Sequence, residues 1–307
     1  MTTINAADSA RTIVAQDLNA KARTSTRGRR PAGRIVLHVV VIALMAVWLI
    51  PTVALLVNSF RPASAVSSSG WWTSLAPPWD FTLANYQHVL EQNNLGDAFI
   101  NSLFITIPST VIPVMVAAFA AYAFAWMNFP YKNAIFVALV GLLVIPLQST
   151  LIPVLRLLAG AHIAGEFLAV WLAHTGYGLP FAVYLLRNYM GGLPREVFES
   201  ASIDGAGPAT SFFRLAVPMS VPVIASLSIF QFLFVWNDLL VSLIYIGPTR
   251  SENLPMTVVV SNLVSSLGGE THFLTAAAFL TMALPLVVFL GLQRYFVRGI
   301  TGGAVKG

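Results

Sequence analysis

Long stretches without a formal charge limit this chain to one class of fold. The first of them, residues 35–60, has 26 residues and contains no Asp, Glu, Lys or Arg. A helix of that length measures about 39 Å, which exceeds the roughly 30 Å hydrocarbon core of a bilayer. Only 9% of all residues are charged, against about 25% in soluble domains. The sequence therefore predicts an integral membrane protein built of helices.

Further apolar stretches bring the number of candidate membrane spans to six. The other five are residues 99–126, 134–155, 167–186, 223–246 and 274–292. Residues 254–267 are partly apolar, but 14 residues are too few to cross a bilayer, so we expect a surface-lying or re-entrant segment there. Residues 1–34 are polar and basic and are expected to form a disordered tail. Residues 35–307 are expected to form one transmembrane domain.

The distribution of basic residues predicts the orientation of these spans. Six spans place both termini on the same side of the membrane. If that side is the cytoplasm, it holds 14 of the 17 Lys and Arg residues, and only Arg61, Arg156 and Arg250 lie outside. Basic residues concentrate on the cytoplasmic side of membrane proteins. Both termini and the long loop of residues 187–222 are therefore expected in the cytoplasm.

Several classes of function are disfavoured by what the sequence lacks. It has no cysteine and no phosphate-binding GxxxxGK[ST] loop, and its five histidines show no metal-ligand spacing. The net charge of +5 follows membrane topology, so we expect no nucleic-acid partner. No Ser/His, paired-acid or HExxH arrangement occurs within the spans, so an enzyme is not expected. An ion-coupled secondary transporter remains as an alternative, although the sequence shows neither the several intramembrane carboxylates nor the internal repeat expected of one.

One polar segment, FESASIDGAGPATSFFRLAVP at residues 198–218, stands between two strongly apolar stretches. Pro194 suits the first turn of a helix, and Glu196 and Glu199 suit the positive end of its dipole. The glycines of GAG at residues 205–207 predict a break, and Pro208 can begin a second helix before Pro218 and Pro222 lead into the next span. The pattern predicts a helix, a turn and a helix beneath the membrane. It fits either a docking surface or a solvated connector.

The same segment resembles the cytoplasmic loop of permease subunits in ATP-binding-cassette (ABC) importers. That loop has the pattern E-A-A, three residues, G, nine residues, I-x-L-P. Here Glu199, Ala201 and Gly205 match, and Leu-Ala-Val-Pro follows nine residues later at 215–218. Ser200 stands in place of the first alanine, which exchanges one small residue for another.

Two more stretches resemble the smaller, six-span permeases of the maltose type. They are FVWNDLLVSL at residues 234–243 and the ending QRYFVRGITGGAVKG. The segment SSSGWWT at 67–73 is similar to the α-glucoside branch of these permeases. The resemblance covers residues 35–307 and implies an all-α integral membrane fold, namely the type I (MetI-like) ABC importer bundle with six transmembrane helices and a cytoplasmic coupling helix.

The resemblance also implies a function and a set of partners. The chain would be one of two permease subunits in the plasma (inner) membrane of a bacterial cell. It would work with two ABC ATPase subunits and an extracytoplasmic sugar-binding protein. ATP and magnesium would be bound by the ATPase subunits, and this chain would need no cofactor of its own. The expected substrate is a di- or oligosaccharide of the maltose or trehalose kind, carried by a non-catalytic transport subunit.

Site residues follow from the same motifs. The expected ATPase interface comprises Glu196, Glu199, Ser200, Ala201, Asp204, Gly205, Phe212, Leu215, Pro218, Gly303, Val305 and Lys306. The last three lie in a glycine-rich tail that is expected either to reach the ATPases or to fray. Candidates for the translocation pathway are Gln148, Trp236, Asn237 and Asp238. Asp238 lies well inside a predicted span, where it would either contact the sugar or pair with a neighbouring helix.

The expected outer loops contain two further features. Trp71, Trp72 and Trp79 fit membrane-interface anchors better than a platform for a sugar ring. The loop of residues 247–272 is a reasonable contact for the sugar-binding protein.

Overall fold

A computed structural model describes residues 31–91, 94–266 and 271–304. Within these ranges the chain consists of helices, turns and connecting loops, with no strand. The chain divides into two compact units, Met1–Leu55 and Leu56–Gly307. The predicted tail lies almost entirely in residues 1–30, outside the described residues. The first described helix begins at Pro31, four residues before the predicted span.

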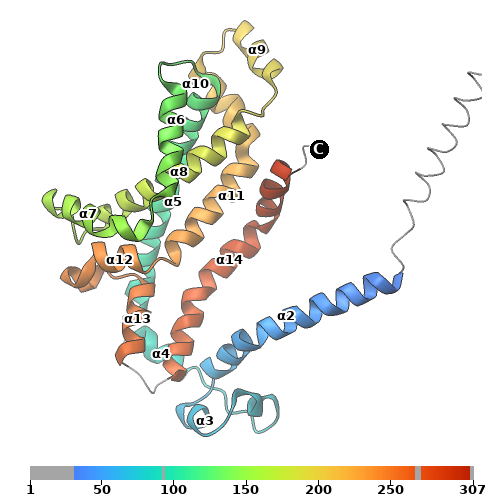
Figure 1. Cartoon of the computed structure of the whole chain (residues 1–307). Coiled ribbons are helices and arrows are strands. Elements are labelled where there is room, and N and C mark those ends of the chain that lie inside the picture. The colour runs from blue at the N-terminus through green and yellow to red at the C-terminus, as the bar shows by residue number, and fades with distance from the viewer. Residues whose placement is uncertain (1–30, 92–93, 267–270, 305–307) are drawn as a thin grey trace, which may run out of the picture. The chain divides into compact units, whose positions relative to one another are not determined.

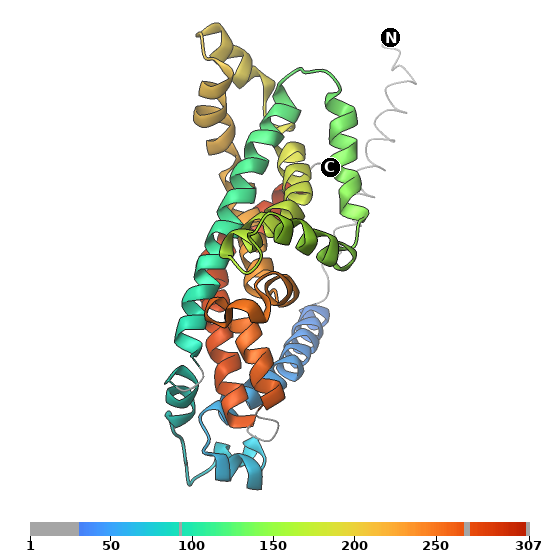
Figure 2. The same cartoon turned by 90° about the vertical axis from the view of Figure 1, so that its left-hand side faces the viewer.

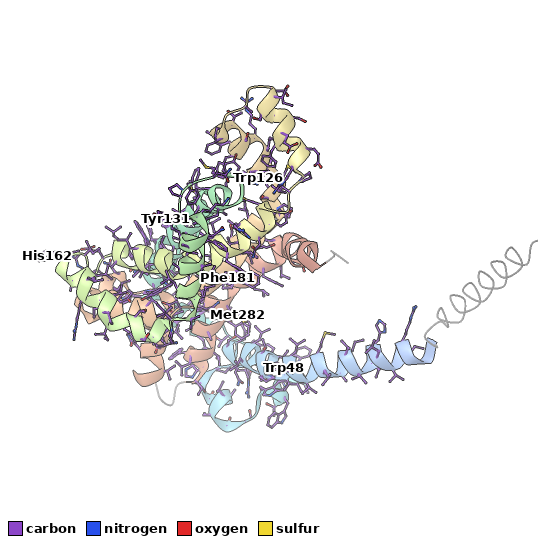
Figure 3. All side chains as sticks on the ribbon, turned by 45° about the horizontal axis from the view of Figure 1, so that its top comes forward. Trp48, Trp126, Tyr131, His162, Phe181 and Met282 are labelled. Atoms are coloured by element: carbon purple, nitrogen blue, oxygen red, sulfur yellow. The ribbon has the colours of Figure 1, made fainter. Side chains whose placement is uncertain are left out.

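Helix α2, Pro31–Ser59, begins in the first unit and ends in the second. Its side chains from residue 33 to residue 53 are all exposed, and Trp48 is 82% exposed. Figure 3 shows side chains extending from every side of this helix, with Trp48 labelled. A helix that is apolar all round needs lipid or another protein around it. Its length and hydropathy agree with the predicted first span.

Four long helices form the core of the second unit (Figure 1). They are α5 (Leu95–Trp126), α8 (Phe167–Met190), α11 (Val217–Trp236) and α14 (Thr271–Ala304). Helix α5 packs along α8, and α11 packs against both α5 and α14. Ala117 and Ala121 of α5 are fully buried in a cluster with Val183 and Leu186 of α8. Such small residues let the backbones of membrane helices approach closely.

The predicted span at residues 134–155 is not one continuous helix in the structure. The structure has α6 (Lys132–Gly141) with a 3₁₀ turn at Leu142–Val144, followed by α7 (Leu147–Gly160). The two parts are bent by 106° relative to each other. Pro146 disfavours the helical conformation for the residue before it, and Ile145 is indeed extended, with φ −76° and ψ 119°. The described residues therefore contain five continuous candidate spans, or six if this bent pair is counted as one broken span.

The predicted span at residues 223–246 is displaced in the structure. A continuous helical segment runs over Pro208–Trp236, and the chain breaks before a short helix α12, Leu240–Tyr245. Pro218 and Pro222 lie inside this segment, which joins the second helix of the polar segment to the span. A π-helical turn at Phe212–Ala216 comes just before Pro218, where the missing proline N–H would interrupt a regular helix.

Shorter elements occupy the two ends of the second unit. Figures 1 and 2 agree that α9 (Arg195–Ile203) and α10 (Pro208–Ser211) lie at one end. At the other end lie α3 (Ala63–Ser68), a 3₁₀ turn at Trp71–Leu75 and α4 (Ala84–Glu91). Opposite ends are what the predicted topology requires for an inner loop and an outer loop.

Helix α13, Met256–Ser266, covers most of the short apolar segment at residues 254–267. It packs against α5 and α14, and its residues Met256, Val258 and Leu263 are buried. This packing makes the segment part of the helical bundle. Helix α14 is longer than the predicted span at 274–292 and continues to Ala304.

Candidate functional site

The polar segment at residues 195–211 folds as predicted, into a helix, a sharp turn and a second helix. Pro194 precedes α9 with φ −60°, and Glu196 lies in its first turn. Gly205 has φ +84°, a left-handed conformation that glycine adopts without steric cost. Its N–H donates to Ser202 O at 3.1 Å, and the next N–H, of Ala206, donates to Ala201 O at 2.9 Å. These two bonds form a Schellman motif, which closes α9 and fixes the direction of the chain.

Aromatic packing anchors this element to the helices above it. Phe198 of α9 is 8% exposed and stacks on Trp126 at the end of α5, with ring centroids 3.9 Å apart. The Trp126 indole N–H donates to Met190 O at the end of α8, at 3.0 Å, and Figure 3 labels Trp126 at this junction. Phe212 packs against Tyr122 of α5 with centroids 5.3 Å apart. The element is therefore held against α5 and α8.

A cavity of about 450 Å³ lies beside α9. It is lined by Ala125, Trp126, Asn128, Gly191, Arg195, Phe198, Glu199 and Ser202. Glu199 is exposed and forms no hydrogen bond or ion pair with any side chain that the structure describes. Its carboxylate is free to accept hydrogen bonds from a partner.

The structure places most of the predicted interface residues on one accessible element. Glu196, Glu199, Ser200, Asp204, Gly205 and Pro218 are exposed, and Ala201 and Leu215 are half-buried. Phe212, by contrast, is only 4% exposed, so it belongs to the core and is not available to a partner. Gly303 lies in the last turn of α14, whereas Val305 and Lys306 lie outside the described residues.

Two exposed apolar residues of this element were not among the predicted interface residues. Ile203 is 88% exposed and Phe213 is 60% exposed. Helical spacing alone does not distinguish contact with the core from contact with a partner, so the sequence did not place these two side chains at the interface. These two side chains are available for the apolar centre of an interface.

The second group of candidates lies where α11 ends. Trp236 is 2% exposed, and its indole N–H donates to Thr281 O of α14 at 2.9 Å. The sequence placed Asp238 well inside a predicted span. In the structure it lies in the break before α12. Its carboxylate accepts hydrogen bonds from the N–H groups of Val241 at 3.3 Å and Ser242 at 3.1 Å. Asp238 precedes the N-cap residue of α12, Leu239, and its carboxylate caps the N–H groups of the first turn.

Asp238 also faces the neighbouring helix α8. The Nε2 atom of His174 lies 3.7 Å from Asp238 Oδ2, and the His174 side chain is fully buried. Thr257 of α13 donates its hydroxyl to the Asp238 carbonyl oxygen at 2.7 Å. These contacts agree with the interpretation in which Asp238 joins helices together.

A cavity of about 470 Å³ opens next to this break. It is lined by Asn237, Leu239, Thr257, Val260, Ala278, Thr281, Met282 and Pro285. Asn237 is the only predicted pathway residue among them, since Trp236 and Asp238 are turned elsewhere and Gln148 is an exposed residue of α7. Thr257 and Thr281, from α13 and α14, were missed because the sequence alone does not bring these helices beside Asn237.

The polar groups of this cavity are mostly acceptors. The Asn237 amide N–H donates to Leu233 O at 2.8 Å, and the Thr281 hydroxyl donates to Ala277 O at 2.9 Å. With the Thr257 hydrogen also used, the three side-chain oxygens keep free lone pairs. No lining residue carries a formal charge. The cavity suits an uncharged ligand that donates hydrogen bonds.

The helical bundle, its candidate spans and the α9–α10 element at residues 195–211 define a polytopic membrane transport subunit. The chain belongs to the family of binding-protein-dependent transport system inner membrane components, whose model matches residues 98–302. The predictions of an ABC importer permease and of its all-α fold are thereby confirmed.

Individual relatives agree with the family. The chain is 50% identical to the osmoprotective compounds uptake permease protein GgtD of Synechocystis, over 94% of this chain and 98% of that protein. It is also 50% identical to the alpha-glucoside transport system permease protein AglG of Rhizobium meliloti, over 77% of this chain and 63% of that protein.

A solved structure shares the fold. It is a bacterial ABC transporter involved in the import of the acidic polysaccharide alginate, with a TM-score of 0.75 and 17% identity. The alignment covers 88% of this chain and 100% of the alginate transporter chain. At this identity the similarity concerns the fold alone.

Proposed function

We propose that this chain is the permease subunit of an ATP-driven importer for an uncharged di- or oligosaccharide or a related glycoside. It forms half of the translocation pathway. The observation that carries this proposal is the α9–α10 element, which is pinned to α5 by Phe198 and continues directly into α11. The names of the relatives, which include an alpha-glucoside permease and an osmoprotectant permease, support the substrate class.

The proposed transporter has four further proteins: a second permease subunit, two ABC ATPase subunits that bind ATP and magnesium, and an extracytoplasmic binding protein. The proposal also includes an orientation in the membrane. The α9–α10 element and both termini face the cytoplasm, and α3 and α4 face outwards. The excess of Lys and Arg on one side supports this orientation.

The geometry suggests how movement of the ATPases reaches the membrane. A push on α9 is passed to α5 through the stacked rings of Phe198 and Trp126. It is passed to α11 through α10, because α10 and α11 belong to one continuous helical segment. Packed cores move as rigid bodies rather than deforming continuously. The two paths can therefore rock α5 and α11 together between inward-open and outward-open states.

The cavity beside Asn237 is the proposed contact with the substrate. Three acceptor oxygens match the hydroxyl donors of a sugar, and Leu239, Val260 and Met282 can contact the C–H faces of its rings. Asp238 contributes by shaping the break in the chain, since its carboxylate is already occupied by the α12 cap. Gln148 and Trp236 have no part in this contact.

Reconstitution of the complete transporter tests the coupling assignment. Glu199→Lys reverses the charge of the free carboxylate, and Gly205→Pro is incompatible with φ +84°. Both are expected to reduce ATP-dependent sugar uptake and sugar-stimulated ATPase activity by tenfold or more, on the order of 1.4 kcal/mol of lost coupling, while membrane insertion is unchanged. Glu91→Lys, an exposed acid on α4, serves as the control.

Two results would contradict the proposal. Unchanged uptake in both variants would remove the coupling role of the α9–α10 element. Ion-gradient-driven uptake by the isolated subunit would favour a secondary transporter instead.

A further inference from the structure

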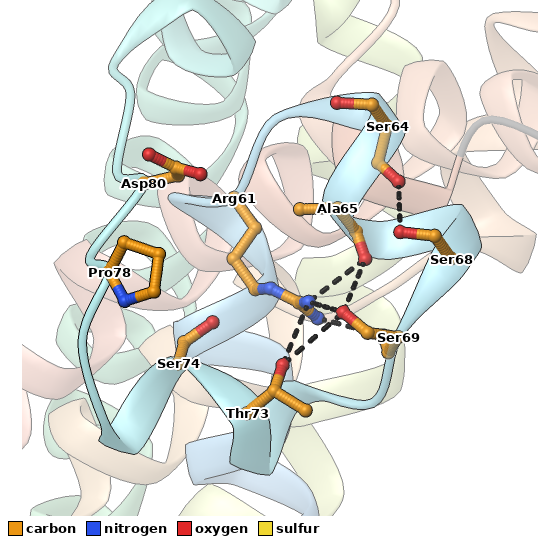
Figure 4. A pocket seen from close by; sticks show the side chains of 9 residues that line it. All are labelled: Arg61, Ser64, Ala65, Ser68, Ser69, Thr73, Ser74, Pro78 and Asp80. Atoms are coloured by element: carbon orange, nitrogen blue, oxygen red, sulfur yellow. Dashed lines mark hydrogen bonds between the residues drawn. The ribbon is translucent and has the colours of Figure 1, made fainter.

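A second polar pocket lies at the end of the molecule opposite to α9. It has a volume of about 360 Å³ and is formed by the segment between α2 and α4 (Figure 4). Its lining residues are Arg61, Ser64, Ala65, Ser68, Ser69, Thr73, Ser74, Pro78 and Asp80. The volume falls within the range of about 300–1,000 Å³ typical of small-ligand sites. Four serines and a threonine give it an unusually high density of hydroxyl groups.

Arg61 forms the buried wall of this pocket, with only 2% of its surface exposed. Its Nη1 donates to Asn58 Oδ1 and Ser69 O, each at 3.1 Å. Its Nη2 donates to Ala65 O at 2.9 Å, to Ser69 Oγ at 2.5 Å and to Thr73 Oγ1 at 3.4 Å. The guanidinium group therefore organises the loop around itself.

One donor of Arg61 is left over. Its Nε is buried and has no hydrogen-bond partner among the described atoms. An unpaired buried donor is unfavourable, and native structures rarely leave one without a reason. Because this atom is enclosed by the protein, Arg61 supports the wall of the pocket and is not counted as a free donor for a ligand.

Asp80 supplies the complementary acceptor. Figure 4 shows Asp80, Pro78 and Ser74 across the pocket from Ser64, Ser68 and Ser69. Asp80 is exposed and is not ion-paired with Arg61 or with any other described side chain. A carboxylate that keeps all its lone pairs can accept two hydroxyl donors at once. The pocket thus has a buried cation in its wall and an exposed anion with free acceptors at its edge.

This arrangement favours a neutral ligand rich in hydroxyl groups. An anionic ligand would be repelled by Asp80, and a cationic ligand would be repelled by Arg61. We propose that the Arg61–Asp80 pocket is an outer subsite that binds one glycosyl unit of the transported sugar. This inference rests on the proposed substrate class and orientation.

Cysteine protection tests the subsite at a single position. The chain contains no cysteine, so Ser68→Cys introduces one thiol at the exposed rim of the pocket. The complete transporter in nanodiscs, without binding protein or nucleotide, is treated with a maleimide in the presence or absence of maltose or trehalose. Labelling of this chain is read by mass spectrometry. Either sugar is expected to slow labelling of Ser68→Cys, whereas buffer with sodium chloride and no sugar is not.

A second substitution makes the test specific. Adding Asp80→Asn to the Ser68→Cys chain should weaken sugar protection by about tenfold in sugar concentration, as expected for the loss of a hydrogen bond to a charged group. Asp97→Asn, an exposed acid at the start of α5 outside this pocket, should leave protection unchanged. Arg61 is kept throughout, because its loss would unfold the loop.

The outcomes separate this inference from the proposed function. No protection by either sugar, or protection that survives Asp80→Asn, overturns the subsite even if the intact system imports sugar. Protection by added binding protein without sugar identifies the pocket as a protein contact and also overturns it. Sugar protection that depends on Asp80, in a system that does not import the sugar, supports the subsite and contradicts the proposed function.

Discussion

The helical segment Pro208–Trp236 begins and ends in opposite ways. At its start, the chain is held by apolar contacts, with Phe198 on Trp126 and Phe212 against Tyr122. At its end, the break is held by polar contacts of Asp238 with the backbone of α12 and with Thr257. A closely packed apolar contact is hardly compressible and transmits a displacement, whereas a hydrogen bond can be exchanged for another one, for example with water. The start of the segment is therefore suited to passing on a push, as the proposed function requires, and its end is suited to rearranging.

The largest effect is expected at the apolar end. Phe198→Ala removes a buried ring and should destabilise the docking of α9 by about 3–5 kcal/mol. Hydrogen exchange of the α9 amides should then increase, and ATP-driven uptake should be lost because the push no longer reaches α5. Phe213→Ala is the matched control for stability, since Phe213 is 60% exposed. Slow exchange in Phe198→Ala would show that α9 is held by something other than this stack.

A smaller effect is expected at the polar end. Asp238→Ala removes the cap of α12 and should cost about 1 kcal/mol locally, which should weaken uptake several-fold. Asp238→Asn keeps an oxygen that can cap a helix and should retain most of the uptake. Equal losses of uptake in the two variants would mean that the charge itself matters, through the sugar or through His174, and would end the interpretation of Asp238 as a cap.

The two ends also differ in how far the sequence predicted them. At the start, Pro194, Gly205 and Pro208 act on their own backbone, and the helix–turn–helix follows from these local preferences. At the end, the break at Asn237 occurs inside an apolar run without glycine or proline. Besides its local bonds, Asp238 contacts Thr257 and His174 there, which are distant in the sequence, and the pattern predicted an unbroken span.

Local preferences gave an incomplete account in two places. Pro218 and Pro222 were expected to lead into the next span, but the sequence did not show that a π-helical turn at Phe212–Ala216 makes residues 208–236 one continuous helical segment. Pro146 lies inside a predicted span, but a bend of 106° between α6 and α7 requires knowledge of what α7 packs against. The cavity at Asn237 was only partly foreseen for the same reason, because its other polar walls come from α13 and α14.

The smallest effect is expected inside that cavity, where one acceptor among three is removed. Thr281→Val keeps the shape of the side chain and deletes its oxygen, so the KM for sugar uptake should rise by roughly fivefold, in line with the net worth of about 1 kcal/mol for one hydrogen bond. Thr175→Val is a matched control, because the Thr175 hydroxyl also donates to a carbonyl four residues earlier, at 2.7 Å, but does not line the cavity. A higher KM with unchanged basal ATPase activity in Thr281→Val alone would place the sugar at the polar end. Equal KM values in the two variants would show that the cavity is not on the sugar's path, and the polar end would then serve only as a hinge.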